Sequence, residues 1–257
     1  MNFNSHHLLT EIICEKMNLS KYIGDEGVAD CVKYSSFPDY VSDIFFKIGT
    51  LKKNTFLGND LSALTHFCKM KNMKSFGYCM NKDGSIAKLK KLEIASIIVK
   101  DMKWNEVLTL DRTIHPVQEL LSIEGYTKDL FKFTFSSASI MGEWICNNKI
   151  KKQWWKAASC VGHLACDVCI RDHCWCTLAN GHSVHEATVE EYLIKNAERI
   201  YDRTVKDRKV EVFEPRKIIE MQAEKTGAWS GRPSNEWVIK SAFSALQDVF
   251  ACFLEKT

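Results

Sequence analysis

The chain has 257 residues, which is enough for one large domain with its own hydrophobic core. Hydrophobic residues make up 46% of it and charged residues 26%, which excludes a disordered or collagen-like protein, and a net charge of +3 gives no specific sign of nucleic-acid binding. Only 4 prolines and 12 glycines favour long helices over a turn-rich β-sandwich or barrel.

The N-terminal residues have no feature of a signal peptide, because they lack a basic start and because Glu11 and Glu15 interrupt their apolar stretch. No run reaches the roughly 18 apolar residues that a membrane span needs. Eleven cysteines in a chain without such a signal indicate reduced thiols or metal ligands rather than disulfides. We therefore expect a cytoplasmic protein.

Helical spacing of apolar residues dominates the chain. Five segments show this spacing or begin with a capping residue: 6–17, 61–70, 92–102, 151–171 and 186–205. Ser5 is the expected N-cap of the first segment. Near the C-terminus, apolar residues from Ile239 to Phe253 form one packing face of a further helix.

The signals for β-strands are few. Residues 209–213 alternate between apolar and polar, and residues 76–89 have the pattern of a hairpin. The simplest fold is therefore all-α, with a single multi-helical domain covering 1–257. Within it, 70–150 is the least constrained part.

Histidines and carboxylates are concentrated between residues 163 and 186. Their order is His163-x3-Asp167-x5-His173-x8-His182-x3-Glu186. The first pair and the last pair are each four residues apart, which places both members of a pair on the same face of a helix. His173 follows the first helix and can turn back toward the same place. Imidazole nitrogens and carboxylate oxygens at this density predict a zinc site.

This pattern resembles that of the bacterial zinc-dependent phospholipase C family, which shares its superfamily with the single-strand-specific nucleases and 3′-nucleotidases. Three upstream motifs resemble the family in the same order: Asn4-Ser5-His6, SSFPDY at 35–40 and LTHFC at 64–68. The resemblance extends as islands from residue 1 to about residue 190. It implies an all-helical domain with a zinc cluster in a cleft. The gap from His66 to His163 is longer than in the family, which indicates a family-variable insertion within 70–150.

The resemblance also implies which residues hold the zinc ions. One ion would have four side-chain ligands: Asp39, His66, His163 and Asp167. A second ion would have three: His173, His182 and Glu186. A third would be held by His6, by Asp167 as a bridge, and by the main-chain amine and carbonyl of Met1. Tyr40 matches an aromatic residue of the family's Pro-Asp motif and is the expected substrate contact.

The expected activity is that of a zinc-dependent phosphodiester hydrolase of the phospholipase C type, acting on glycerophospholipid headgroups in a membrane surface. Two or three zinc ions would activate water and stabilise the phosphoryl oxygens, while Asp39 orients or deprotonates the attacking water. Ala63 stands where the family has an aromatic residue, which argues against choline-type recognition. A lipase in the cytoplasm also needs control, by a regulatory protein partner, by a lid from 70–150 or by delivery into another cell.

Two alternatives remain open. A single-strand nuclease or 3′-nucleotidase would use a similar ligand set, although Glu186 in the last position favours the lipase branch over the nucleases, which tend to have aspartate there. In a different class, a non-catalytic zinc-stabilised interaction module would use Cys166-x2-Cys169 with His173.

Two further histidines adjoin predicted ligands. His7 competes with His6 for the first ligand position, and we favour His6 with His7 facing away. His185 precedes Glu186 but lies off the predicted ligand face of its helix, so it is not among the expected ligands.

Overall fold

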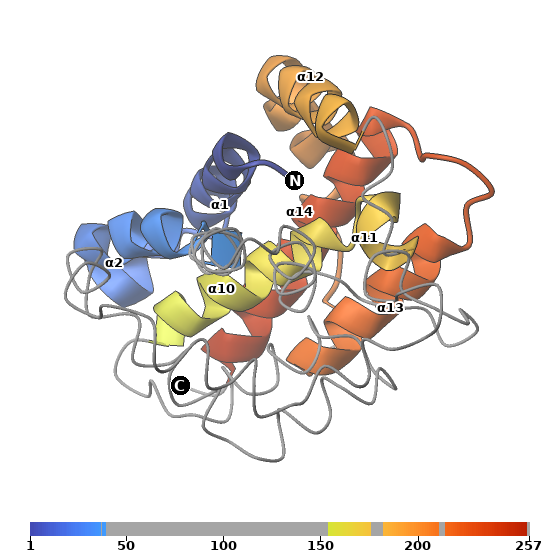
Figure 1. The fold of residues 1–257 in the computed structure, drawn as a ribbon. Helices are drawn as coiled ribbons and strands as arrows, with labels where there is room; N and C mark the ends of the chain where they lie inside the picture. Colours follow the sequence, from blue (N-terminus) through green and yellow to red (C-terminus); the bar gives the residue numbers. More distant parts are fainter. Residues whose placement is uncertain (37, 40–153, 176–181, 211–213, 256–257) are drawn as a thin grey trace, which may run out of the picture.

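The computed structural model describes residues 1–36, 38–39, 154–175, 182–210 and 214–255, and the following statements concern these residues. They form seven helices and no strand (Figure 1). The prediction of an all-α fold is therefore confirmed. Several predicted features lie outside the described residues: the helices at 61–70 and 92–102, the hairpin at 76–89 and the insertion within 70–150.

Two helices come first in the chain, α1 (Phe3–Lys16) and α2 (Ser20–Tyr34). Asn2 caps α1, because its side-chain oxygen accepts a hydrogen bond of 3.1 Å from the backbone N–H of Ser5. The prediction of Ser5 as the cap was therefore wrong by three residues, and Ser5 lies inside the helix. The spacing of apolar residues did not predict α2, which is kinked at Gly24 with a φ of 68°.

Helix α10 (Trp154–Asp167) ends four residues before the end of the predicted helix at 151–171, whose first three residues lie outside the described part of the chain. The chain turns at residues 168–170, and the short helix α11 (Arg171–Trp175) follows. Val168 and Ile170 are fully buried in this turn, so their apolar character continues the helical pattern although the helix has ended. The turn places His173 on a separate helix from His163.

Three longer helices complete the described fold: α12 (His182–Thr204), α13 (Pro215–Gly227) and α14 (Asn235–Leu254). Helix α12 begins four residues before the predicted 186–205, so that His182 is its first residue. Helix α13 begins with a proline and was not predicted. A strand was predicted at 209–213. Residues 209–210 do not form a strand, and 211–213 lie outside the described residues.

Helix α14 packs against α10, α12 and α13 (Figure 1). Its Phe243, Leu246 and Phe250 are at most 1% exposed. Gly162 of α10 allows the closest approach, because a Cβ atom at this position would lie 2.5 Å from a methyl carbon of Leu246. This packing forms the apolar core of the described part of the chain.

Among the described helices, α14 alone is long and apolar enough to cross a membrane by length and composition. Its most apolar window has a mean hydropathy of 1.3 and is 61% buried inside the fold. The core helix of a globular domain meets the same criterion, so this finding is weak evidence for a membrane span.

Candidate metal centre

Seven predicted ligand side chains come together from four helices and from the short segment after α2. They form two groups of potential metal ligands, in each of which the ligand atoms lie within 4.8 Å of one another. The first group is His6 of α1, Asp39 and His163 of α10. The second group is His173 of α11 with His182 and Glu186 of α12. The seventh side chain, Asp167 of α10, contacts members of both groups.

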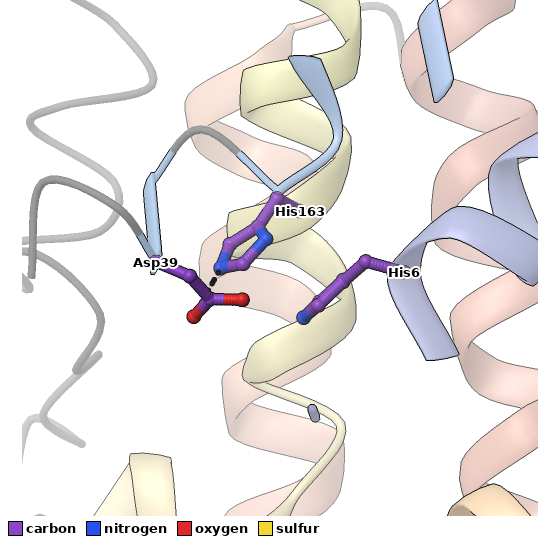
Figure 2. A group of neighbouring side chains, drawn as sticks. All are labelled: His6, Asp39 and His163. Atoms are coloured by element: carbon purple, nitrogen blue, oxygen red, sulfur yellow. Dashed lines mark ion pairs between the residues drawn. The ribbon is translucent and has the colours of Figure 1, made fainter. Parts of the chain in front are cut away.

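The first group is built around the buried ring of His163 (Figure 2). Its Nε2 lies 3.6 Å from Oδ1 of Asp39, and its ring stacks on that of His6 with 3.7 Å between the ring centroids. Its Nδ1 lies 2.6 Å from the backbone carbonyl oxygen of Ser35. Since a carbonyl only accepts hydrogen bonds, Nδ1 carries the proton. Nε2 is therefore the nitrogen that faces the carboxylates and that can bind a metal ion once it is deprotonated.

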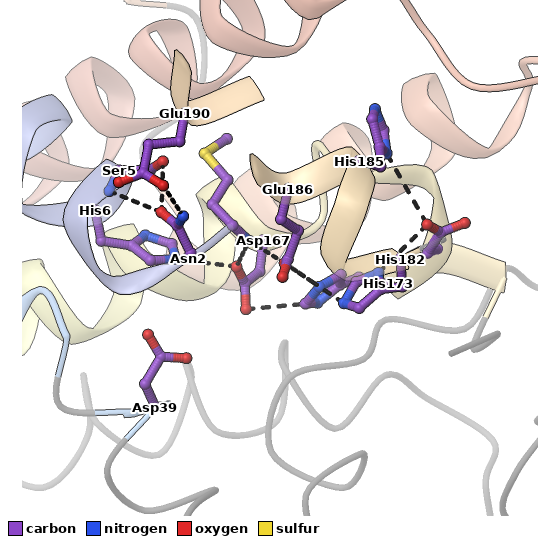
Figure 3. Close-up of polar contacts among 12 residues, drawn as sticks. Asn2, Ser5, His6, Asp39, Asp167, His173, His182, His185, Glu186 and Glu190 are labelled. Atoms are coloured by element: carbon purple, nitrogen blue, oxygen red, sulfur yellow. Dashed lines mark hydrogen bonds and ion pairs between the residues drawn. The ribbon is translucent and has the colours of Figure 1, made fainter. Parts of the chain in front are cut away.

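Asp167 links the two groups through its two carboxylate oxygens (Figure 3). Its Oδ1 lies 3.0 Å from Nε2 of His6 and 2.5 Å from the amine of Met1. Its Oδ2 lies 3.3 Å from Nε2 of His163 and 3.5 Å from Nδ1 of His173. The side chain is 1% exposed. A buried carboxylate between imidazoles of three helices is suited to bridge two cations.

The second group is centred on Oε1 of Glu186. This oxygen lies 3.4 Å from Nε2 of His173, 3.5 Å from Nε2 of His182 and 3.0 Å from the amine of Met1. His182 and Glu186 are one helical turn apart on α12, as His163 and Asp167 are on α10. The side chains of His182 and Glu186 are 14% and 16% exposed, so this group is more accessible than Asp167.

Two of the carboxylates, Asp167 and Glu186, are ionised despite their burial. Burial opposes ionisation of Asp167, but the Met1 ammonium, His173 and His163 lower its pKa well below the usual value. The same balance holds for Glu186, where the Met1 ammonium and a hydrogen bond from His173 outweigh burial and lower the pKa. Ionised carboxylates are the form that binds metal ions.

Two of the imidazoles are neutral at neutral pH. Burial lowers the pKa of His6 to about 4, and the neighbouring His163 acts in the same direction. Burial also lowers the pKa of His173. Neutral imidazoles keep a nitrogen lone pair for a metal ion.

Two further basic groups of the centre, His163 and the Met1 amine, have raised pKa values in the metal-free chain. At His163, burial lowers the pKa, but Asp39 and Asp167 outweigh it. At the Met1 amine, burial is outweighed by Asp167 and Glu186, which raise the pKa to about 11. The carboxylates thus stabilise positive charge at His163 and at the Met1 amine, and these buried His, Asp and Glu groups could hold a metal ion.

The structure places eight of the predicted site residues at this centre. The side chains are His6, Asp39, His163, Asp167, His173, His182 and Glu186, and the eighth is the amine of Met1. His66 and Tyr40 lie outside the described residues. His7 points elsewhere, because its Nε2 lies 2.9 Å from the hydroxyl oxygen of Ser36.

The cysteines of the alternative zinc module do not join either group. The thiol of Cys166 points to the backbone carbonyl of Ala242 on α14, and that of Cys169 to the carbonyl of Ala165. Both are at most 1% exposed, and burial raises the pKa of each thiol above its usual value. They are buried as neutral thiols, in the form that packs like a small apolar side chain.

Sequence reasoning missed Asp172, which adjoins the second group. Its Oδ2 lies 3.3 Å from Nδ1 of His182, 3.1 Å from the guanidinium of Arg232 and 3.9 Å from Nδ1 of His185. Burial raises its pKa, but the hydrogen bond from His182, the nearby ring of His185 and the charge of Arg232 outweigh burial and hold the pKa below the usual range. The only sequence feature that could have pointed to Asp172 is its position directly before His173. Its partner Arg232 is 60 residues away along the chain, so no local pattern connects the two.

No protein-family model matches the chain, and the comparisons with curated proteins and with solved structures also give no significant match. The function is therefore argued from the geometry of this centre.

Proposed function

We propose that the chain is a zinc-dependent phosphodiester hydrolase of the phospholipase C type. The observation that carries the proposal is the bridging position of Asp167, which contacts imidazoles of both potential metal groups through its two oxygens. Adjacent cation sites that share a carboxylate are typical of enzymes that displace an ester oxygen from phosphorus.

The spacing of the donor atoms fits zinc. With zinc–nitrogen and zinc–oxygen bonds of about 2.0–2.1 Å, neighbouring donors of a tetrahedral site lie about 3.4 Å apart. The nitrogen–oxygen distances are 3.6 Å for His163–Asp39, 3.3 Å for His163–Asp167, 3.4 Å for His173–Glu186 and 3.5 Å for His182–Glu186. Nitrogen and carboxylate oxygen are also the donor types that zinc accepts.

The residues divide into two sites with a third beside them. Asp39, His163 and Asp167 would hold one ion, with His66 as the further ligand that the family resemblance implies. His173, His182 and Glu186 would hold the second. His6, Asp167 and the Met1 amine would hold a third. For this the Met1 ammonium, which Asp167 and Glu186 stabilise, would have to lose its proton.

Zinc, when bound, lowers the pKa of a coordinated water and withdraws charge from phosphoryl oxygens. Asp39 is the most exposed of the three carboxylates, at 30%, and this exposure supports the proposal that it orients the attacking water and takes its proton. The new bond forms between the water oxygen and phosphorus as the ester bond on the opposite side breaks, and the leaving oxygen takes a proton from solvent. Ser35 keeps the ring of His163 in place through its carbonyl.

The proposed substrate is a glycerophospholipid at a membrane surface, and a nuclease or 3′-nucleotidase activity is the alternative that the assay must separate. A structural Cys/His module is less well supported, because the thiols of Cys166 and Cys169 contact backbone carbonyls. The cytoplasmic location and the regulatory partner stay predictions.

The test measures metal content and product formation on the same preparation. Elemental analysis should give two to three zinc ions per chain, and chelation should abolish activity that re-metallation restores. A phospholipid, a nitrophenyl phosphodiester and single-stranded DNA, assayed side by side, separate the lipase from the nuclease. A zinc-free active enzyme would contradict the proposal, as would a metal-loaded protein that cleaves none of these esters.

Variants at the bridge make the test specific. Asp167→Asn or His163→Ala should lower kcat/KM by at least about a thousandfold, because metal-assisted charge stabilisation contributes several kcal/mol. His7→Ala is the matched control, since His7 neighbours His6 but contacts Ser36, and it should retain both metal and activity. Retained turnover in Asp167→Asn would contradict the role of the bridge.

A further inference from the structure

The carboxylate of Asp172 lies at the meeting point of three parts of the chain. Asp172 belongs to α11, His182 and His185 to α12, and Arg232 to the segment between α13 and α14. All three basic side chains approach the same oxygen, Oδ2, at 3.3, 3.9 and 3.1 Å respectively. The side chain of Asp172 is 5% exposed, so its carboxylate is largely removed from solvent.

His182 uses its two ring nitrogens in different directions. Nε2 lies 3.5 Å from Glu186, inside the second metal group, whereas Nδ1 lies 3.3 Å from Asp172. An ionised carboxylate only accepts hydrogen bonds, so Nδ1 donates the proton in this contact and Nε2 is the nitrogen left to face a metal ion. The ring of His182 is thereby oriented toward His173 and Glu186 (Figure 3).

We propose that Asp172 is a positioning residue of the metal centre, which fixes the tautomer and the ring orientation of His182. This inference rests on the proposed metal-dependent function. Carboxylates that hold the second nitrogen of a histidine ligand orient the ring and increase its basicity. Asp172 itself is not a ligand, because its oxygen lies on the Nδ1 side of the ring, next to a guanidinium that repels a further cation.

Arg232 completes the arrangement by holding Asp172 in place. Its side chain is 38% exposed, and its guanidinium pairs with the same oxygen that His182 uses. The equivalent contact in the first group is made by an uncharged acceptor, since Nδ1 of His163 lies 2.6 Å from the carbonyl of Ser35. In both groups, therefore, an acceptor at Nδ1 of a histidine orients its ring. In the second group this acceptor is the side chain of Asp172, which can be substituted.

The test compares metal affinity in Asp172→Asn with that of the wild type. Asparagine keeps the shape but removes the charge and can present an N–H to Nδ1. Zinc titration against a chromophoric chelator should show one ion bound about 10- to 100-fold more weakly and the other ion unchanged. The visible spectrum of the cobalt-loaded protein should change, because it reports ligand geometry. Asp172→Glu, which keeps the charge, should restore part of the affinity.

Asp30→Asn is the matched control. Asp30 also accepts a ring N–H, from Trp155 at 3.2 Å, and pairs with a base, Lys156 at 3.3 Å, but it belongs to neither metal group. It should leave the zinc affinity and the cobalt spectrum unchanged. An equal loss of affinity in Asp30→Asn would overturn the inference, as would wild-type affinity and spectrum in Asp172→Asn.

Arg232→Gln keeps the inference testable if Asp172→Asn does not fold. It removes the cation that holds Asp172 and should weaken the same ion to a smaller degree, whereas unchanged affinity would overturn the inference. A wild-type chain that binds no zinc or cobalt would refute the proposed function itself. A wild type that binds normally, together with unaffected variants, would refute only the role of Asp172.

Discussion

Helix α10 borders two buried regions of opposite character. Toward α14 it presents Gly162 and Cys166, which meet Leu246 and the backbone of Ala242 in an apolar environment. Toward α1 and α11 it presents His163 and Asp167, two side chains at 1% exposure or less that are in ion-pair distance of other polar groups. One helix of 14 residues thus supports both the core and the candidate metal centre.

The two regions differ in how strictly the positions of their side chains are constrained. Apolar burial is non-directional and contributes roughly 25 cal/mol per Å² of buried surface, so the region around α14 stabilises the fold through the area it removes from water. The buried carboxylates and imidazoles contribute only if each has a partner at the right distance. The apolar core therefore stabilises the fold, and the stable fold holds the charged groups of the polar region close to one another.

The largest expected effect on folding comes from the apolar region. Phe243→Ala removes a ring that is fully buried and meets Tyr201 edge-on, with 5.5 Å between centroids. It should lower the free energy of unfolding by about 3–5 kcal/mol, measured by urea denaturation. Metal content should stay unchanged. Tyr22→Ala, at a side chain 60% exposed, should change stability by less than about 0.5 kcal/mol. Loss of metal from folded Phe243→Ala would show that the two regions are not separable.

The pH dependence of the metal-free protein should come from the polar region. The pKa of His6 is about 4 in the folded chain and 6.5 as the ordinary value, so the unfolded chain binds more protons between these values. The contribution of His6 is complete above pH 6.5 and is lost as the pH falls through 4, by about 3 kcal/mol. His163 acts in the opposite direction, since Asp39 and Asp167 raise its pKa.

Denaturation curves between pH 4 and 7 test this contribution. His6→Gln should flatten the fall in stability toward low pH, because glutamine does not titrate. Phe243→Ala should lower stability at every pH and leave the slope as it is. An unchanged slope in His6→Gln would mean that His6 is not buried as a neutral ring.

The smallest expected effect is at the contact between α10 and α14. Gly162→Ala places a Cβ atom 2.5 Å from a methyl carbon of the buried Leu246, and such overpacking costs about 1–3 kcal/mol. Alanine gains about 0.5–1 kcal/mol in a helix, so a net loss of about 1 kcal/mol is expected in thermal or urea unfolding. Gly231→Ala, with nothing within 4 Å, is the control. A stabilised Gly162→Ala would show that the helices can separate without cost.

Local patterns predicted the helices with a clear apolar face. Helices α1, α10, α12 and α14 were predicted in this way, because the spacing of buried residues along one helix is a property of its own sequence. Helix α2 was missed because Gly27 and Cys31 are its only buried residues, too few for a periodic signal. The end of α10 was misplaced because Val168 and Ile170 remain buried after the helix stops.

In the candidate site, too, some contacts could be predicted from local spacing and others could not. The pairs His163–Asp167 and His182–Glu186 follow from four-residue spacing within single helices. The contact of Asp172 with Arg232 joins residues 60 positions apart, and that of Ser35 with His163 joins residues 128 apart. No spacing rule connects such pairs, because their separation depends on how the helices pack.

The sequence alone determined the helical class and the residue types that face each other one turn apart, since both depend on interactions within a few residues. Tertiary packing decided that Asp167 lies between the two groups, that His6 rather than His7 faces it, and that Asp172 holds the far side of His182. The physical reason is that these carboxylates and imidazoles interact strongly with one another and with a metal ion only after several helices have removed them from water. That burial depends on how the helices pack, and not on the sequence of any one helix.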